Sequence, residues 1–244
     1  MTAFESIQLE HGSVALSFTV PVTYVSSIKA LAISFSAESA EPHSAIELHA
    51  AFIQHCVNFG SSEEVLAVFD SFCQAFGTAT IDIHVTAQAQ DLDEAAARRV
   101  LKGYFSAWSI VNNHGAWPTA STPALFASDS VGLMAMFGGQ RGTGNYLDEA
   151  EWLYDVYRPL LSDYVSRMSA FLHRESQDKR VSFVYSKGLD VFTWLTTANT
   201  MPDELYLLSI PVCQPLVALI QLMHVMVLHK TLGVSPGDLA KRFK

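Results

Sequence analysis

The chain has few cysteines, and they are isolated from one another. Cys56, Cys73 and Cys213 are the three among 244 residues, and they form no CxxC pair. A disulfide framework or a zinc site requires cysteines in a closer and more regular pattern. The sequence therefore predicts a protein that folds without disulfides in a reducing compartment, the cytoplasm.

Basic charge is scarce as well. The chain carries 15 Lys plus Arg against 24 Asp plus Glu, a formal net charge of −9. Such a chain repels a phosphate backbone, which excludes a basic nucleic-acid binder. Glycine and proline are also few, at 13 and 9 residues, whereas half of all residues are hydrophobic. This composition excludes a disordered chain and predicts a sizeable core, in one domain or two.

The N-terminal sequence does not resemble a secretory signal, because no basic residues precede an apolar run. One apolar stretch, 205–229, is long enough to cross a bilayer. Its Gln, His and Pro residues would be costly in hydrocarbon, so the sequence predicts no membrane span. Pro215 is instead expected to divide the stretch into a short strand, 206–210, and a buried helix, 215–231.

Hydrophobic periodicity predicts a leading hairpin followed by helices. Apolar residues tend to alternate over 7–20, around a turn at 11–13, as in a β-hairpin. Ser61 and Glu64 have the spacing of a capping box at the start of a helix. Residues 78–90 mix both periodicities, and their Ala and Gln content favours a weak helix. Apolar residues recur at helical spacing in four segments: 24–33, 45–59, 61–77 and 91–112.

A loop rich in turn-forming residues, 113–123, marks a change in the character of the sequence. An apolar run of strand length follows at 131–137, and then a glycine-rich turn at 138–142. A long helical pattern occupies 146–172, with a kink expected at Pro159. The order strand, glycine turn, helix predicts an α/β arrangement.

Patterns that carry chemistry are sparse. The histidines lack metal-ligand spacing, and neither an HExxH sequence nor a Cys/His cluster occurs, so no metal site is expected. The turn Gly138-Gly139-Gln140 is more informative, because it directly follows the predicted strand. Glycines at the carboxyl end of a strand let backbone N–H groups face a bound anion. Such amides can stabilise an oxyanion, although a pair of glycines is more often only a tight connection.

Several segments together resemble a known family. MAMFGGQ at 134–140 and NYLDEAEWLYDVYRPLLSDYV at 145–165 resemble the start of the acetyl (acyl) transferase domain of the fungal-type fatty acid synthase β subunit. GLDVFTWL at 188–195 and PDELYLLSIPVCQPLVALIQLMHVMV at 202–227 are similar to the same domain, in the same order. HGSVALSFTVP at 11–21 resembles the leading hairpin of the family. The resemblance covers nearly the whole chain.

The resemblance implies two domains in an α/β chain. Residues 1–123 would be a mainly helical N-terminal region with a leading hairpin, and 124–244 the N-terminal half of an acyltransferase domain, an incomplete α/β lobe. It also implies a ping-pong reaction, in which the serine of a GHSxG elbow takes an acetyl or other starter acyl group from coenzyme A. The acyl group then passes to the phosphopantetheine thiol of acyl carrier protein.

By the same resemblance, the backbone N–H of Gln140 would contribute to the oxyanion hole, supported by the turn at Gly138 and Gly139. Acetyl-CoA or another acyl-CoA is the expected substrate, with no tightly bound cofactor. The implied partners are the remaining part of the β subunit, the synthase complex and acyl carrier protein.

Two features depart from the family pattern. Arg141 stands where the family has the last glycine of GGQG, and its side chain restricts the turn that Gln140 needs. No serine of this chain lies in a GHSxG sequence. We therefore expect these residues alone to be inactive and to need completion by other polypeptide. The alternative is a non-catalytic assembly or stabilising subunit of a synthase, and an unrelated helical interaction module remains if the segment order is coincidence.

Half of an α/β lobe has a physical consequence. Apolar surface is expected to be uncovered on the predicted last helix, because its packing partners would be missing. Exposed apolar surface of this kind predicts poor solubility or self-association. The residues concerned are Leu216, Leu219, Ile220 and Met223.

Overall fold

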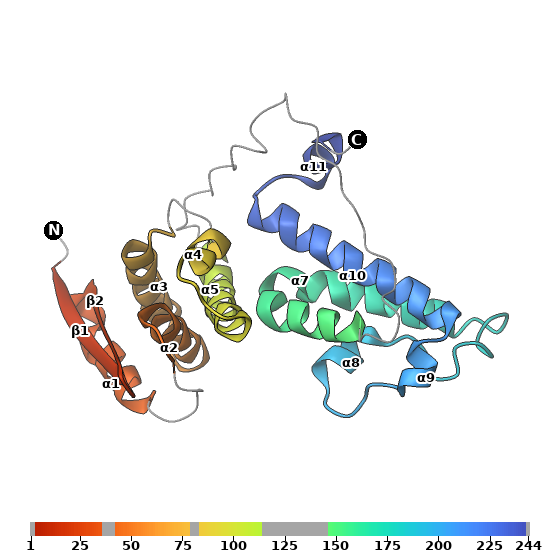
Figure 1. Ribbon diagram of the computed structural model, residues 1–244, viewed down its shortest axis with the longest axis horizontal. Helices are drawn as coiled ribbons and strands as arrows, with labels where there is room; N and C mark the ends of the chain where they lie inside the picture. The colour runs from red at the N-terminus through yellow and green to blue at the C-terminus, as the bar shows by residue number, and fades with distance from the viewer. Residues whose placement is uncertain (1–2, 36–41, 79–82, 114–145, 243–244) are drawn as a thin grey trace. The chain divides into compact units, whose positions relative to one another are not determined.

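The computed structural model describes residues 3–35, 42–78, 83–113 and 146–242. The chain divides into two compact units, Met1–Ala120 and Ser121–Lys244. The described residues are mostly helical and begin with a β-hairpin, as the sequence predicts (Figure 1). The predicted strand at 131–137 and the predicted boundary after residue 123 fall outside the described residues.

The leading hairpin consists of β1 (Phe4–His11) and β2 (Val14–Pro21) in antiparallel pairing. Gly12 has a positive φ of 58°, which the tight turn between the strands requires. Alternate side chains of both strands are buried, so one face of the hairpin packs on the rest of the unit. The buried residues are Ile7, Leu9, Leu16, Phe18 and Val20.

The helices of the N-terminal unit lie close to the predicted ranges. Ser61 and Glu64 form the predicted capping box, and Gly77, with φ +70°, ends the helix that this box begins. The segment 78–90 contains a helix over its described part, which confirms the weak helix predicted there. The elements after the hairpin are η1 (Val22–Tyr24), α1 (Val25–Ser34), α2 (Ala45–Phe59), α3 (Ser62–Phe76), α4 (Ile83–Ala89) and α5 (Glu94–Asn113).

The core of this unit forms where α2, α3 and α5 pack against one another and where α2 and α3 pack against β2. Gly103 of α5 lies against the backbone of Ala50 in α2, and a methyl group at position 103 would overlap the Ala50 carbonyl. The absence of a side chain at Gly103 therefore sets how closely the two helices approach. Aromatic rings fill the remaining space, among them Phe52, Phe69 and Phe72.

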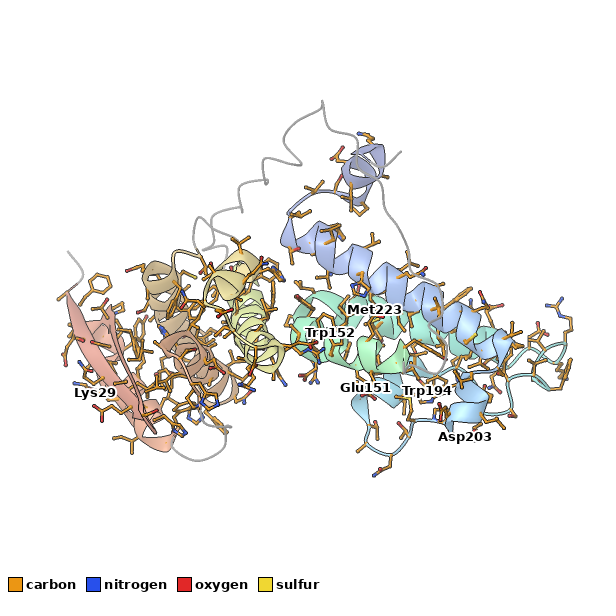
Figure 2. All side chains as sticks on the ribbon, viewed as in Figure 1. Lys29, Glu151, Trp152, Trp194, Asp203 and Met223 are labelled. Carbon is orange, nitrogen blue, oxygen red and sulfur yellow. The ribbon has the colours of Figure 1, made fainter. Side chains whose placement is uncertain are left out.

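In the C-terminal unit, α10 packs along the much longer α7. Helix α7 contains the predicted kink: Tyr157 has non-helical angles (φ −108°, ψ 24°), two residues before Pro159. The proline ring cannot follow a regular helical turn, because it clashes with the preceding turn and provides no N–H. Met223 of α10 and Trp194 of α8 are buried side chains of this unit (Figure 2). The described helices are α7 (Tyr146–Ser176), α8 (Val191–Thr196), α9 (Glu204–Leu207), α10 (Ile210–Thr231) and α11 (Pro236–Arg242).

The predicted strand at 206–210 is wrong, because this segment contains the end of α9 and the start of α10. The side chain of Asp203 accepts a hydrogen bond from the backbone N–H of Tyr206 at 3.0 Å, and this cap starts α9. A short apolar run does not distinguish a buried helix from a strand, which is the reason for the error.

Pro215 does not divide the apolar stretch either, since α10 continues through it. A proline inside a helix leaves the carbonyl four residues earlier without its usual partner. That carbonyl belongs to Pro211, and the hydroxyl of Tyr185 donates to it at 3.2 Å. The helix therefore tolerates Pro215 because a side chain distant in sequence replaces the missing N–H.

Candidate functional site

The predicted oxyanion turn lies outside the described residues. This holds for Gly138, Gly139 and Gln140, and for Arg141, which follows them. Their proposed role therefore stays a prediction. The described residues do include the beginning of α7 at Tyr146, six positions after Gln140, and the elements to which that helix is attached.

Tyr146 anchors the start of α7. Its hydroxyl donates a hydrogen bond of 2.6 Å to the backbone carbonyl of Leu207, the last residue of α9. Burial raises the pKa of Tyr146 to about 12, and the nearby Cys213 adds to this shift. The phenol is therefore neutral at physiological pH and acts as a donor. This contact attaches the start of α7 to the junction of α9 and α10.

Two further tyrosines act in the same way on the loop between α7 and α10. Tyr206 donates at 2.6 Å to the carbonyl of Gly188, a residue with a positive φ of 67°. Tyr185 donates to Pro211, as described above. Lys187 forms an ion pair with Asp203, the residue that caps α9. Each hydroxyl donates to a main-chain carbonyl, so these three tyrosines hold the backbone in place. Their hydroxyls are therefore engaged in structural contacts and are not positioned for catalysis.

A buried serine and an aspartate meet where α7 approaches α8. Ser169 is 1% exposed, donates to Asp190 at 3.1 Å and accepts from the Phe192 N–H at 2.8 Å. Burial alone would raise the pKa of Asp190, but hydrogen bonds from Thr193 and Ser169 outweigh it and hold that pKa below its ordinary value. Asp190 therefore stays ionised as the cap of α8.

Ser169 and Asp190 do not form a nucleophile and its orienting acid. A nucleophilic serine needs a base that accepts its proton and a route to substrate. Here the hydroxyl is buried and is already bonded to a carboxylate and to a backbone N–H. The arrangement joins two helices, and we assign it a structural role.

Two of the buried thiols are poor nucleophiles as well. Burial raises the pKa of both Cys56 and Cys73 to about 12, which keeps them protonated and unreactive. Within the described ranges, no three His, Cys, Asp or Glu side chains gather as metal ligands do. The described residues thus hold helices in position but supply no recognisable nucleophile.

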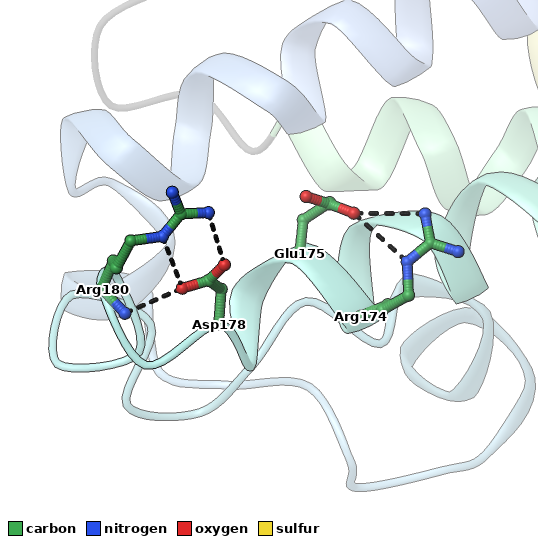
Figure 3. Close-up of polar contacts among 4 residues, drawn as sticks. All are labelled: Arg174, Glu175, Asp178 and Arg180. Carbon is green, nitrogen blue, oxygen red and sulfur yellow. Dashed lines mark hydrogen bonds and ion pairs between the residues drawn. The ribbon is translucent and has the colours of Figure 1, made fainter.

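Ion pairs lie at the end of α7 and in the loop that follows it. Arg180 binds Asp178 through two nitrogens, at 2.7 and 3.0 Å, and Arg174 binds Glu175 (Figure 3). Hydrogen bonds from Arg180 hold the pKa of Asp178 below its ordinary value. Phe183, in the same loop, is 80% exposed. Exposed pairs of this kind contribute little to stability, so they give no evidence of a binding site, and Phe183 is the most exposed large apolar side chain in this loop.

The apolar side chains that α10 exposes are not the ones that the sequence analysis expects to be exposed. Leu216, Leu219, Ile220 and Met223 are buried, because this side of α10 is the one that packs on α7. The expectation that they are exposed is therefore wrong. The large apolar side chains that α10 does expose are Ile210, Leu222 and Leu228.

Helix α10 is long and apolar enough to cross a membrane when judged by length and composition, and a third of its most apolar window is buried. Core helices of soluble proteins pass the same test. The predicted absence of a membrane span stays a prediction.

Comparison with known proteins places these units in context. Residues 3–111 match the N-terminal domain in fatty acid synthase subunit beta. The chain is 38% identical over 166 residues to the fatty acid synthase subunit beta of Schizosaccharomyces pombe, covering 66% of this chain and 8% of that protein. It is 34% identical over 173 residues to the subunit beta of Saccharomyces cerevisiae, covering 67% and 8%.

The chain is related to the N-terminal region of fungal fatty acid synthase β subunits. The similarity also extends into the C-terminal unit, since the β subunit of Aspergillus oryzae is 24% identical over 249 residues, or 99% of this chain. In these three relatives the matched segment makes up 8–12% of the whole protein. The predicted resemblance to the β subunit is confirmed.

The tyrosine contacts are the feature that sequence reasoning missed. No local pattern distinguishes Tyr146, Tyr185 and Tyr206, and their partners are carbonyls 18 to 61 residues away. One signal was present in the sequence. Pro215 within a long apolar helix frees a carbonyl, which then requires a donor from elsewhere in the chain.

Proposed function

We propose that this chain is part of an acetyl or starter acyltransferase of a fatty acid synthase, which moves an acyl group from coenzyme A to acyl carrier protein. The backbone N–H of Gln140, in the turn begun by Gly138 and Gly139, would stabilise the oxyanion. Since no serine among these 244 residues lies in a GHSxG sequence, the nucleophile would come from outside them. The assembly would work in the cytoplasm, with the rest of the β subunit and the synthase complex as partners.

The observation that carries this proposal is the relationship of the chain to β subunits, which spans both of its units. The anchoring of Tyr146 adds a physical argument. A backbone amide stabilises an oxyanion only when it is held in place before the reaction. Tyr146 fixes the chain six residues after Gln140, and six residues span at most about 20 Å, so the amide stays within that distance of the start of α7.

Arg141 favours a second candidate function, that of a non-catalytic assembly or stabilising subunit of a synthase. Where relatives have the last glycine of GGQG, this chain has a bulky side chain. A side chain there restricts the backbone and can turn the Gln140 N–H away from the reacting oxygen. The scaffold would then be retained without the chemistry.

Labelling of the serine tests the first function. The chain would be mixed with a polypeptide that bears the GHSxG half of a related β subunit, and radiolabelled acetyl-CoA added. We expect label on that serine only when both polypeptides are present. Gln140→Pro, which removes the N–H, should slow labelling by about 10²–10³-fold. Gln140→Ala keeps the N–H and should label at nearly the original rate.

The same experiment separates the two candidates. A stable complex without labelled serine contradicts the catalytic proposal and supports the assembly role. Restoration of labelling by Arg141→Gly in that complex would identify Arg141 as the cause. Equal labelling with Gln140→Pro and Gln140→Ala would show that this amide has no part in the reaction.

A further inference from the structure

His49 lies at the centre of the N-terminal unit, in the middle of α2. It is 0% exposed, and neither ring nitrogen makes a hydrogen bond of good geometry, although the Val68 backbone of α3 lies near the ring. Its ring packs against Phe18 of β2, with 4.9 Å between ring centroids. On the other side it contacts Phe72 and Phe76 of α3, at 5.3 and 6.0 Å. The imidazole is thus the point at which the hairpin and α3 meet on α2.

An imidazolium at this position would have no counter-charge. Strand β2 carries no ionisable side chain. On α3, Glu63 and Asp70 are exposed, and Glu64 caps its own helix. On α2 itself, Glu47 already pairs with Arg99 of α5. The remaining ionisable group of α3, the Cys73 thiol, is neutral, because burial raises its pKa to about 12.

A polar ring in a hydrocarbon cage is tolerable only while it is uncharged. Burial lowers the pKa of His49 from 6.5 to about 3, although the Val68 backbone carbonyl acts in the opposite direction. Between these two pH values, an opened form that exposes the ring binds a proton that the closed form excludes. Lowering the pH therefore favours opening, by about tenfold for each pH unit below 6.5, and the effect is absent above that pH.

We propose that His49 is an acid-sensitive latch: protonation of its ring releases the β1–β2 hairpin from α2 and α3. The hairpin is a part that can leave as a unit. It forms a two-stranded sheet whose own hydrogen bonds remain when it moves. One apolar face holds it on α2 and α3, and an ion pair between Glu5 and Lys29 joins it to α1. Moving it exposes the ring by separating Phe18 from His49, whereas α2 and α5 stay packed around Gly103.

Hydrogen exchange followed by mass spectrometry tests the latch on the 244-residue chain. Exchange would be measured at pH 7.0, 5.5 and 4.5 and corrected for the intrinsic rate at each pH. We expect peptides from 4–21 to open about tenfold more from pH 5.5 to 4.5. Peptides from α5 should keep their protection over the same interval.

Two variants complete the test. His49→Phe fills the cage with a ring that binds no proton, and it should abolish the pH dependence of the hairpin peptides. His55→Gln removes a partly exposed histidine of the same helix, bonded to Ser34 at 2.9 Å, and should leave the dependence unchanged.

Three results overturn the proposal. The first is hairpin protection in the original chain that does not change with pH. The second is a loss of hairpin protection at low pH that is accompanied by loss of protection in α5, which indicates unfolding of the whole unit. The third is a pH dependence that persists in His49→Phe. The first two are read from the original chain, so they hold even if the variant fails to fold.

Discussion

The two units use buried polar groups differently. In the N-terminal unit, Glu47 is 3% exposed and binds Arg99 at 2.6 Å, which joins α2 to α5 through side chains alone. In the C-terminal unit, tyrosine hydroxyls such as that of Tyr146 donate to main-chain carbonyls. The first arrangement fixes how helices fit together, and the second repairs places where proline or a loop leaves backbone unpaired. The N-terminal unit should therefore be the more sensitive to changes in helix packing.

The largest effect is expected at Gly103. Gly103→Ala places a methyl group against the Ala50 backbone, which cannot move aside as a flexible side chain would. We expect the free energy of unfolding of the N-terminal unit to fall by about 3 kcal/mol. Urea titration, with hydrogen exchange of α2 peptides to locate the change, measures this loss.

Gly237→Ala in α11 is the matched control for Gly103→Ala. The nearest atom to a methyl group there is the Ser235 hydroxyl, at 3.9 Å. Alanine also has the higher helix propensity, so stability should be unchanged or slightly higher. Equal responses to the two substitutions would contradict the close approach of α2 and α5.

A smaller loss is expected when the buried ion pair is broken. Glu47→Gln keeps an acceptor for the His43 N–H and the Ser44 hydroxyl at the start of α2, but it leaves the Arg99 guanidinium without its counter-charge. Arg99 is partly exposed, so we expect a loss of about 2 kcal/mol in unfolding free energy, less than for a fully buried pair. Thermal unfolding in low salt measures it.

Arg167→Gln is the control for that pair. Arg167 and Asp163 form an exposed ion pair on α7 at 2.8 Å. Its removal should change the unfolding free energy by no more than about 0.5 kcal/mol. A comparable loss from both substitutions would mean that burial of Glu47 contributes nothing.

The contrast between the units also explains what could be predicted from the sequence. The hairpin, the capping box at Ser61 and the stop at Gly77 depend on residues close in sequence, and all three are confirmed. The kink near Pro159 is local as well, because the proline ring acts on its own helix. Local rules were sufficient at these four places.

Long-range contacts set the limit of those rules. The strand predicted at 206–210 failed because its apolar residues fit either element, and the Asp203 cap and packing on α7 decided for helix. Burial of Leu216 and Leu219 depends on which face α10 turns to α7, which hydrophobicity all around a helix does not reveal. The oxyanion turn at Gln140 lies outside the described residues, so its prediction rests on the family relationship.

The smallest effect separates anchoring from packing in the C-terminal unit. Tyr146→Phe keeps the ring but removes the hydroxyl, which leaves the Leu207 carbonyl without this donor. We expect a loss of about 1 kcal/mol in unfolding free energy, as for one buried hydrogen bond. Hydrogen exchange of peptides from α9 and the first turn of α7 should increase, while α2 peptides stay unchanged. Tyr185→Phe is the matched control, because its hydroxyl makes a longer bond of 3.2 Å near the surface, and its loss should be smaller. A larger effect from Tyr185→Phe would mean that the carbonyl freed by Pro215, rather than the start of α7, is the contact on which this unit depends.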